Sequence, residues 1–168
     1  MDTLMKMHLG KPMKYAGTAL LLMTVIARAQ EPTALSVKSR IDLSNVNGRI
    51  DHFSADLKGQ RRFMAALGNH TVEVLDLQTG KRIRSIPDLA EPQGVFYDAA
   101  TNRLFVASAS DGTTKMFDGT TFQLLETVNL GGDADNIRYD SRGRRVIVGY
   151  GDGLLFAPRC LCCCSFRR

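Results

Sequence analysis

The sequence has no cysteine before position 160, and this absence excludes several kinds of site from most of the chain. There is no CxxCH haem attachment, and no cysteine next to the small residues at 27–29 that could carry a lipid anchor. A glycine loop of the kind that cradles phosphate is also missing, and no serine forms a legible pair with a catalytic base. These absences favour a binding protein over an enzyme.

Positive charge is not gathered into one stripe, although the formal net charge is +5 and the isoelectric point is about 9.2. Part of the excess lies in the first fourteen residues and part in the last ten, and between them Lys and Arg alternate with Asp. A nucleic-acid interface needs a clustered basic surface, usually with aromatic residues between the charges. Nucleic acid is therefore not favoured as a partner, and a solvated surface of mixed charge is expected.

The first 29 residues have the three parts of a cleavable export signal. Lys11 and Lys14 are positively charged, the run 16–27 is apolar, and the sequence at 27–29 (Ala-Arg-Ala) is a small-x-small cleavage site. The apolar run is about twelve residues, too short to span a bilayer as a helix, which needs about 20; the alternative is a buried N-terminal helix. We predict cleavage after Ala29, a periplasmic or secreted mature chain, and no stable membrane span after signal removal.

The rest of the chain repeats itself with a period of 42 residues. This spacing separates two sets of three identical residues, which are Asp56, Asp98 and Asp140 and then Arg61, Arg103 and Arg145. Each unit reads as four short strands divided by turns, and the second strand is nearly all apolar, as expected when both of its faces are covered. Four antiparallel strands in about 42 residues make the blade of a β-propeller. We therefore predict an all-β fold of four-stranded antiparallel blades.

The repeated Asp and Arg residues have structural explanations. Asp56 and its two equivalents each end a first strand and open a turn, where the carboxylate can accept bonds from backbone N–H groups. Asp76 and Asp118 end the third strand and are expected to do the same. The repeated arginines stand at the entry to the second strand, and each is expected to pair with a turn carboxylate.

The repeat divides the chain into a signal peptide, a linker, blades and a tail. Residues 30–47 are the N-terminal linker and include 35–43, which resembles a fourth strand and is expected to act as a ring-closing strand. Two full units cover 48–89 and 90–131, and 132–153 is a partial third unit. The prediction is about two and a half blades of an incomplete ring, whose exposed blade edges favour self-association.

Residues 154–168 depart from the repeat and form a cysteine-rich tail. Pro158 falls inside the expected third strand, and Cys160 stands where the strand-ending Asp is due. All four cysteines lie in the last nine residues, where a CxxC pair is present but no second pair or nearby His completes a zinc site. We interpret the tail as out-of-frame or truncated sequence; intermolecular disulfides and a metal site are the alternatives.

Three segments of the second unit carry a family resemblance. PQGVFYD at 92–98, NRLFVA at 102–107 and MFD at 116–118 resemble YVTN-type β-propeller repeats, and the whole is similar to the exported bacterial YncE-like proteins. The resemblance covers residues 45–153 and implies a propeller fold. It implies roles from ligand or partner binding and cell-surface association to cofactor-linked chemistry, so it indicates the fold and leaves the activity open.

In a propeller, the loops that enter the first strands and those that join second to third strands share one face, around the central channel where ligands commonly bind. On this face, here called the loop face, the candidate binding residues are Asp51, His52, His70, Gln93, Asp111, Asp135 and Asn136. Neutral imidazole with carboxylates could hold a divalent ion, and His52, Asp51 and Asp135 are the candidate metal ligands. The alternative is that these residues shape turns and line a wet channel.

Together, these features predict an exported, non-enzymatic binding module that takes a protein partner or a small polar ligand on its loop face. No cofactor is predicted. The alternatives are a fragment of a propeller enzyme, either a metal-dependent lactonase-like hydrolase or an oxidoreductase subunit, and a remnant without activity. A bound divalent metal would favour the enzyme.

Overall fold

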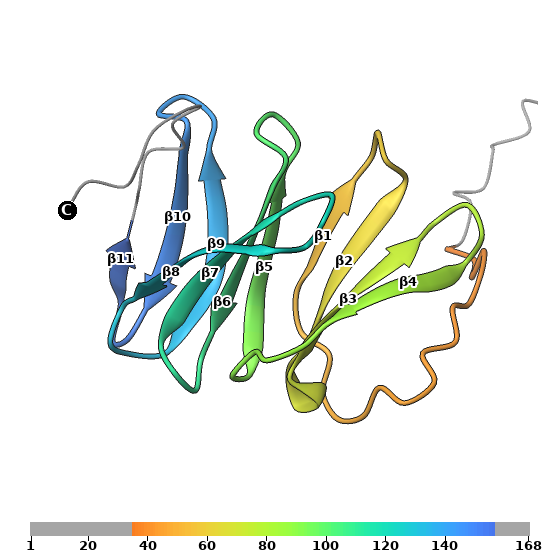
Figure 1. Ribbon diagram of the computed structural model, residues 1–168, viewed down its shortest axis with the longest axis horizontal. Helices are drawn as coiled ribbons and strands as arrows, with labels where there is room; N and C mark the ends of the chain where they lie inside the picture. Colours follow the sequence, from red (N-terminus) through yellow and green to blue (C-terminus); the bar gives the residue numbers. More distant parts are fainter. Residues whose placement is uncertain (1–34, 157–168) are drawn as a thin grey trace, which may run out of the picture. The chain divides into compact units, whose positions relative to one another are not determined.

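The computed structural model describes residues 35–156, which form eleven β-strands and one short 3₁₀ helix (Figure 1). No α-helix occurs in this range, so the prediction of an all-β fold is confirmed for the described residues. Among them there is also no helical segment with the length and hydropathy of a membrane span. The predicted signal peptide at 1–29 and the cysteines of the predicted tail lie outside the described residues.

The strands form three antiparallel sheets, A, B and C, which follow one another along the chain within one compact unit. Sheet A contains, in spatial order, β1 (Phe53–Asp56), β2 (Arg61–Ala66), β3 (Thr71–Asp76) and β4 (Lys81–Ile86). Sheet B contains β5 (Pro92–Asp98), β6 (Arg103–Ser108), β7 (Thr113–Asp118) and β8 (Leu124–Asn129). Sheet C contains β9 (Ala134–Asp140), β10 (Arg145–Tyr150) and β11 (Leu154–Phe156), and the helix η1 (Leu67–Asn69) lies between β2 and β3.

Sheets A and B match the predicted units of four antiparallel strands, whereas sheet C has three strands within the described residues. The three sheets do not close into a ring within residues 35–156. Residues 35–52 form turns and bends but no strand, so residues 35–43 are not part of a sheet in this structure. Their ring-closing role stays a prediction.

The third unit leaves the repeat earlier than Pro158 indicates. In sheet B, Ala107 pairs with Thr114, seven residues further along the chain. In sheet C, Gly149 stands at the position of Ala107 but pairs with Leu155, only six residues further along. The β10–β11 connection is therefore one residue shorter than its β6–β7 counterpart. From 151–153 onward, equivalent positions are no longer 42 residues apart.

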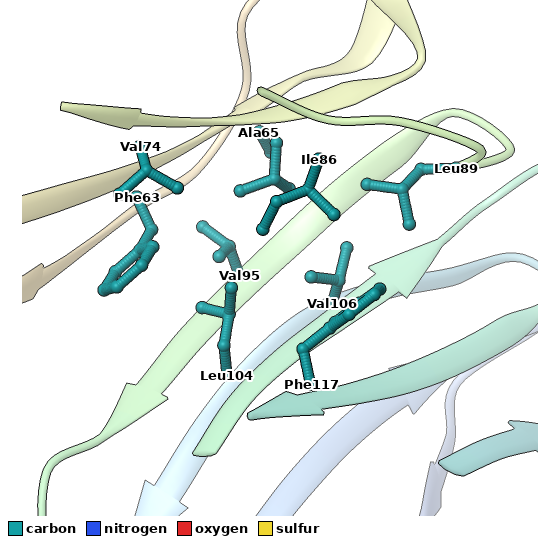
Figure 2. Close-up of a cluster of buried hydrophobic side chains, with 10 residues drawn as sticks. Phe63, Ala65, Val74, Ile86, Leu89, Val95, Leu104, Val106 and Phe117 are labelled. Carbon is teal, nitrogen blue, oxygen red and sulfur yellow. The ribbon is translucent and has the colours of Figure 1, made fainter. Parts of the chain in front are cut away.

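Apolar side chains of sheets A and B meet in one cluster, here called junction A–B. Figure 2 shows side chains of the two sheets pointing toward one another, among them Phe63 and Val74 from sheet A and Leu104 from sheet B. The buried members are Phe63, Ala65, Val72, Val74, Ile86, Leu89, Val95, Leu104, Val106 and Phe117. Burial of a large aliphatic or aromatic side chain contributes about 1.5–3 kcal/mol, so this cluster is a main source of stability.

Sheet B packs against sheet C through its other face, here called junction B–C. This second cluster comprises Phe105, Ala107, Ala134, Ile137, Val146 and Val148. Alternate residues of β6 therefore serve the two junctions, because Leu104 and Val106 face sheet A while Phe105 and Ala107 face sheet C. Coverage of both faces explains why this strand is nearly all apolar, as the sequence predicts.

The repeated aspartates form the predicted turns. Each carboxylate accepts at least one bond from a backbone N–H two or three residues further along, as Asp56 does from Gly59 at 2.8 Å. The other four are Asp76, Asp98, Asp118 and Asp140. The bond from the Thr79 N–H holds the pKa of Asp76 below its usual range, and the bonds from the Thr121 and Thr120 N–H groups do the same for the pKa of Asp118.

All three repeated arginines pair with a turn carboxylate as predicted, but not with the equivalent one. Arg61 binds Asp56 at 2.7 Å and Arg145 binds Asp140 at 3.0 Å, whereas Arg103 binds Asp118. The residue in the turn decides this difference. Glycines at 59 and 143 leave room for the Asp–Arg pair, since a Cβ at either position would overlap the Asp carboxylate. In sheet B the equivalent residue is Thr101, whose hydroxyl donates to Asp98 and occupies the oxygen that Arg103 would bind.

Candidate functional site

The loop face is formed where the first strand of each sheet begins. The strands β1 and β5 contact one another, and so do β5 and β9. Backbone pairing continues beyond the start of β1, because Asp51 N donates to Ala65 O and Ala65 N donates to His52 O, both at 2.9 Å. The candidate residues Asp51 and His52 are therefore fixed to sheet A by main-chain bonds rather than carried on a free loop.

A glycine sets the approach of sheets B and C at this end. A Cβ at Gly94 would overlap the backbone carbonyl oxygen of Asp135 and lie 2.9 Å from a side-chain carbon of Ile137. Residue 94 is equivalent to His52 in the first unit and Asn136 in the third. Only glycine at this position lets the start of β9 lie directly against β5, which brings Asp135 to the loop face.

Hydrogen bonds join the loops of the three sheets in a row. The backbone N–H of His52 donates to Gln93 O at 3.4 Å, which links sheet A to sheet B. The side-chain Nε2 of Gln93 donates to Asp133 Oδ1 at 3.3 Å, which links sheet B to the loop before β9. Residues about 40 positions apart are thereby held side by side at one end of the sheets.

The first candidate group on the loop face contains Arg49, Asp51 and His52. Arg49 Nη2 donates to Asp51 Oδ2 at 2.8 Å. His52 Nδ1 lies 3.0 Å from Asp51 Oδ1, but the geometry makes no hydrogen bond, so this buried nitrogen has no hydrogen-bond partner within the described residues. The rest of the imidazole reaches solvent, since the side chain is 36% exposed.

The second candidate group contains Asp135 and Asn136. Asn136 Nδ2 donates to Asp135 Oδ2 at 3.0 Å. The other oxygen, Asp135 Oδ1, is buried and has no hydrogen-bond partner within residues 35–156. The loop face thus carries two polar atoms, His52 Nδ1 and Asp135 Oδ1, whose hydrogen-bonding capacity the described chain does not use.

The structure gives His70 and Asp111 local roles. His70 ends η1 in the left-handed conformation with φ 59°, and its Nδ1 accepts from the Glu91 N–H at 3.4 Å. Asp111 Oδ1 accepts from the backbone N–H and the hydroxyl of Thr113, at 3.0 and 2.7 Å. No hydrogen bond or ion pair between described residues joins either one to the other candidates. Both match the alternative interpretation, in which loop residues shape turns.

The candidate metal ligands are not gathered into a site. Within residues 35–156 no group of three or more His, Cys, Asp or Glu side chains is placed to hold a metal ion. His52 and Asp51 are neighbours on sheet A, whereas Asp135 belongs to sheet C. The spacing of these residues depends on how the sheets pack, which no local pattern in the sequence reveals.

Two residues of the loop face were missing from the predicted set, Arg49 and Asp133. Arg49 neutralises Asp51, and Asp133 receives the side chain of Gln93. Both fall in loops that the repeat already places on this face, at 49–52 and 133–136. A complete list of charged loop residues would have found them.

The loop face is negatively charged. Its connecting segments are 49–52, 67–70, 87–91, 109–112, 130–133 and 151–153. They hold six carboxylates, which are Asp51, Asp88, Glu91, Asp111, Asp133 and Asp152. Their single Lys or Arg is Arg49, which pairs with Asp51, and Lys115 of β7 donates to the carbonyl oxygen of Asp88, so the carboxylates still outnumber the cations. This charge favours a cationic ligand.

Comparison with known proteins supports the fold and little else. No family model and no curated protein matches the chain. Among solved structures, the chain is similar to Kuenenia stuttgartiensis hydrazine synthase, with a TM-score of 0.57 and 17% sequence identity. The match covers 71% of this chain and 33% of that one, so it spans about a third of the larger structure. At this identity the likeness concerns the arrangement of the sheets.

Proposed function

We propose that residues 48–153 are blades of an exported β-propeller whose loop face binds a protein partner or a small polar ligand. Support for blades comes from the 42-residue period, the four antiparallel strands of sheets A and B, and the likeness to part of a larger solved structure. The YVTN-type segments support the same fold. Export is supported by the sequence of residues 1–29.

The observation that carries the binding role is the hydrogen-bonded row of loops. Three sheets contribute to it through His52, Gln93 and Asp133, which makes one continuous surface from separate units. Buried polar atoms without a partner cost about 1–3 kcal/mol each. Because both atoms are buried, a ligand would satisfy His52 Nδ1 and Asp135 Oδ1 and recover that free energy only if their side chains turned toward it.

The charge of the surface selects the class of ligand. Because its carboxylates outnumber its cations, the loop face fits a lysine or arginine side chain or another organic cation better than an anion. A cationic group hydrogen-bonded to Asp135 would supply the donor that Oδ1 lacks. The proposed partner is therefore a protein segment or small polar molecule with exposed positive charge.

Isothermal titration with a hexalysine peptide at low salt tests the proposal. We expect saturable binding, and Asp135→Asn should weaken it about five-fold, which corresponds to about 1 kcal/mol. Glu126→Gln is the matched control, because it also removes one carboxylate but lies on β8, away from the loop face. Absence of binding, or an equal loss in both variants, would contradict the proposed site.

A further inference from the structure

The end of the sheets opposite the loop face has the opposite charge. It is formed by five turns, here called the turn end, at 57–60, 77–80, 99–102, 119–123 and 141–144. These turns contain no Asp or Glu, and their charged residues are Lys58, Arg142 and Arg144. All three are exposed, and no ion pair of the described residues includes them.

Of the aspartates that end strands here, Asp76 and Asp98 bond only to groups of their own turns and pair with no cation of the described residues, whereas those beside Lys58 and Arg142 are ion-paired. Asp140, beside Arg142, accepts two backbone N–H groups and the guanidinium of Arg145. Asp56, beside Lys58, accepts the Gly59 N–H and both Nε and Nη2 of Arg61. These carboxylates are therefore held away from the exposed cations of the turns.

The backbone conformation at residue 144 does not explain why an arginine is found there. This residue has φ 50°, in the left-handed region, where asparagine is favoured and arginine is not. The equivalent residues are Gln60 in the first unit, with φ 51°, and Asn102 in the second, with φ 53°. The turn accepts three different side chains in the three units, so its backbone conformation does not itself select the exposed guanidinium of Arg144.

The two charged ends are too far apart to neutralise one another in a single copy. Antiparallel order places them at opposite ends of strands of mostly six or seven residues, about 20 Å long. The screening length at physiological ionic strength is about 8 Å. The positive turn end and the negative loop face therefore each remain available to an outside partner.

We infer that the turn end of one copy binds the loop face of a second copy. The inference rests on the loop face as a binding surface, and the second copy supplies the cationic segment that this surface fits. The contact joins two different surfaces, so it is head-to-tail and can continue from copy to copy. Because the attraction is electrostatic, added salt weakens it.

Sedimentation velocity of the full chain tests the inference. A reductant keeps the cysteines at 160 and 162–164 from crosslinking copies. At about 20 mM NaCl the mean sedimentation coefficient should rise with protein concentration, and at about 500 mM NaCl it should return to the monomer value. A monomer at every concentration in low salt, or an association that salt leaves unchanged, would overturn the inference.

Charge reversal locates the two surfaces. Arg142→Glu with Arg144→Glu makes both ends negative, and Glu91→Lys with Asp152→Lys makes the loop face less negative. Each double variant alone should lose at least about ten-fold in self-association. An equimolar mixture of the two should form one-to-one pairs, because the unchanged turn end of the second variant then meets the unchanged loop face of the first. The mixture also controls for folding, since a misfolded variant would not be rescued.

Lys38→Glu with Arg84→Glu is the matched control. It changes the net charge by the same amount as the turn-end variant, but both residues are exposed outside the two ends. It should keep the self-association; an equal loss would assign the effect to net charge and overturn the inference. Hexalysine binding without self-association would also overturn it while leaving the proposed function intact.

Discussion

Junctions A–B and B–C are built from the same repeat positions, yet they are filled differently. Phe63 and Phe105 are equivalent, and both are buried. The ring of Phe63 lies 5.1 Å from Tyr97 and 6.4 Å from Phe122, whereas the contact of Phe105 with another aromatic ring is with Phe96 at 6.4 Å. Phe63 therefore has more aromatic neighbours than Phe105, although a second aromatic pair, Phe96 with Tyr139 at 5.4 Å, also joins sheets B and C.

The arginines show what coverage by the next sheet changes. Arg61 donates Nε and Nη2 to Asp56 and Nη1 to Gly119 O of sheet B, and its guanidinium lies within 6 Å of three aromatic rings. Arg145, at the same repeat position, makes one bond to Asp140 and has a side chain 45% exposed. The same residue thus ties two sheets together only where a following sheet covers it.

Truncation of the equivalent phenylalanines should give the largest effects. Phe63→Ala is expected to lower the free energy of unfolding by about 4 kcal/mol, from lost burial and the cavity that remains. Phe105→Ala should cost about 1 kcal/mol less, because it loses fewer aromatic contacts. Urea unfolding followed by circular dichroism measures both. Equal losses would show that the two junctions contribute alike.

Removal of the equivalent arginines should separate a position that the next sheet covers from one that no sheet of the described residues covers. Arg61→Met leaves the buried carboxylate of Asp56 without its charge partner and should cost about 3 kcal/mol. Arg145→Met breaks an exposed pair and should cost less than about 1 kcal/mol. The same urea experiment measures the two values, and a cost for Arg145→Met as large as that for Arg61→Met would contradict the comparison.

A methyl group added at junction B–C should have a smaller but local effect. Gly94→Ala forces β9 away from β5 and should cost about 2 kcal/mol, with faster amide hydrogen exchange in β9. Gly149→Ala is the control, because the nearest atom to its added Cβ, Asn136 O, is 3.9 Å away. It should change stability by less than about 0.5 kcal/mol. Unchanged exchange in Gly94→Ala would contradict the close approach of these strands.

The smallest effect is expected from pH. Burial raises the pKa of Asp56, but hydrogen bonds from the Gly59 N–H and Arg61, together with the charge of Arg61, outweigh it and leave this pKa below its usual range. A carboxyl whose pKa is lower in the folded state stabilises the fold above its unfolded pKa, about 3.9. That contribution is lost as the pH falls through the folded pKa.

The urea midpoint should therefore stay level from about pH 7 to pH 5 and fall below about pH 4. The hydrogen bond from the Gly143 N–H and then Arg145 also lower the pKa of Asp140, which is more exposed than Asp56. Asp56→Asn should therefore reduce the fall of the urea midpoint at acidic pH more than Asp140→Asn does. A midpoint that rises on acidification would contradict the sign of these shifts.

Much of this fold follows from the sequence, because the period places turns and strands by simple alternation. The aspartate turns and the pairing of each repeated arginine with a turn carboxylate were predictable for the same reason. Which carboxylate each arginine binds was not predicted, although Thr101 in place of a turn glycine was a visible signal for Arg103. The one-residue shift of the repeat at 151–153 was not predicted, because it falls in a glycine-rich loop where the loss of one residue leaves no clear sign in the sequence.

The candidate site was predictable only in outline. The antiparallel strand order places Asp51, Gln93 and Asp135 at one end of the sheets, and this placement does not depend on side-chain contacts. The bond from Gln93 to Asp133 and the dispersal of the metal candidates depend on how neighbouring sheets approach. That approach is set by contacts such as Gly94 against Asp135, which no local pattern in the sequence reveals.

The central claim is that loops from three sheets form one binding surface. Backbone amide NMR of the labelled chain, titrated with hexalysine at low salt, tests it most directly. The largest shift changes should fall together at 51–52, 93 and 133–136, with one shared affinity. Changes concentrated in the outer strands β4 and β8, or different affinities for the three loops, would contradict a single loop-face site.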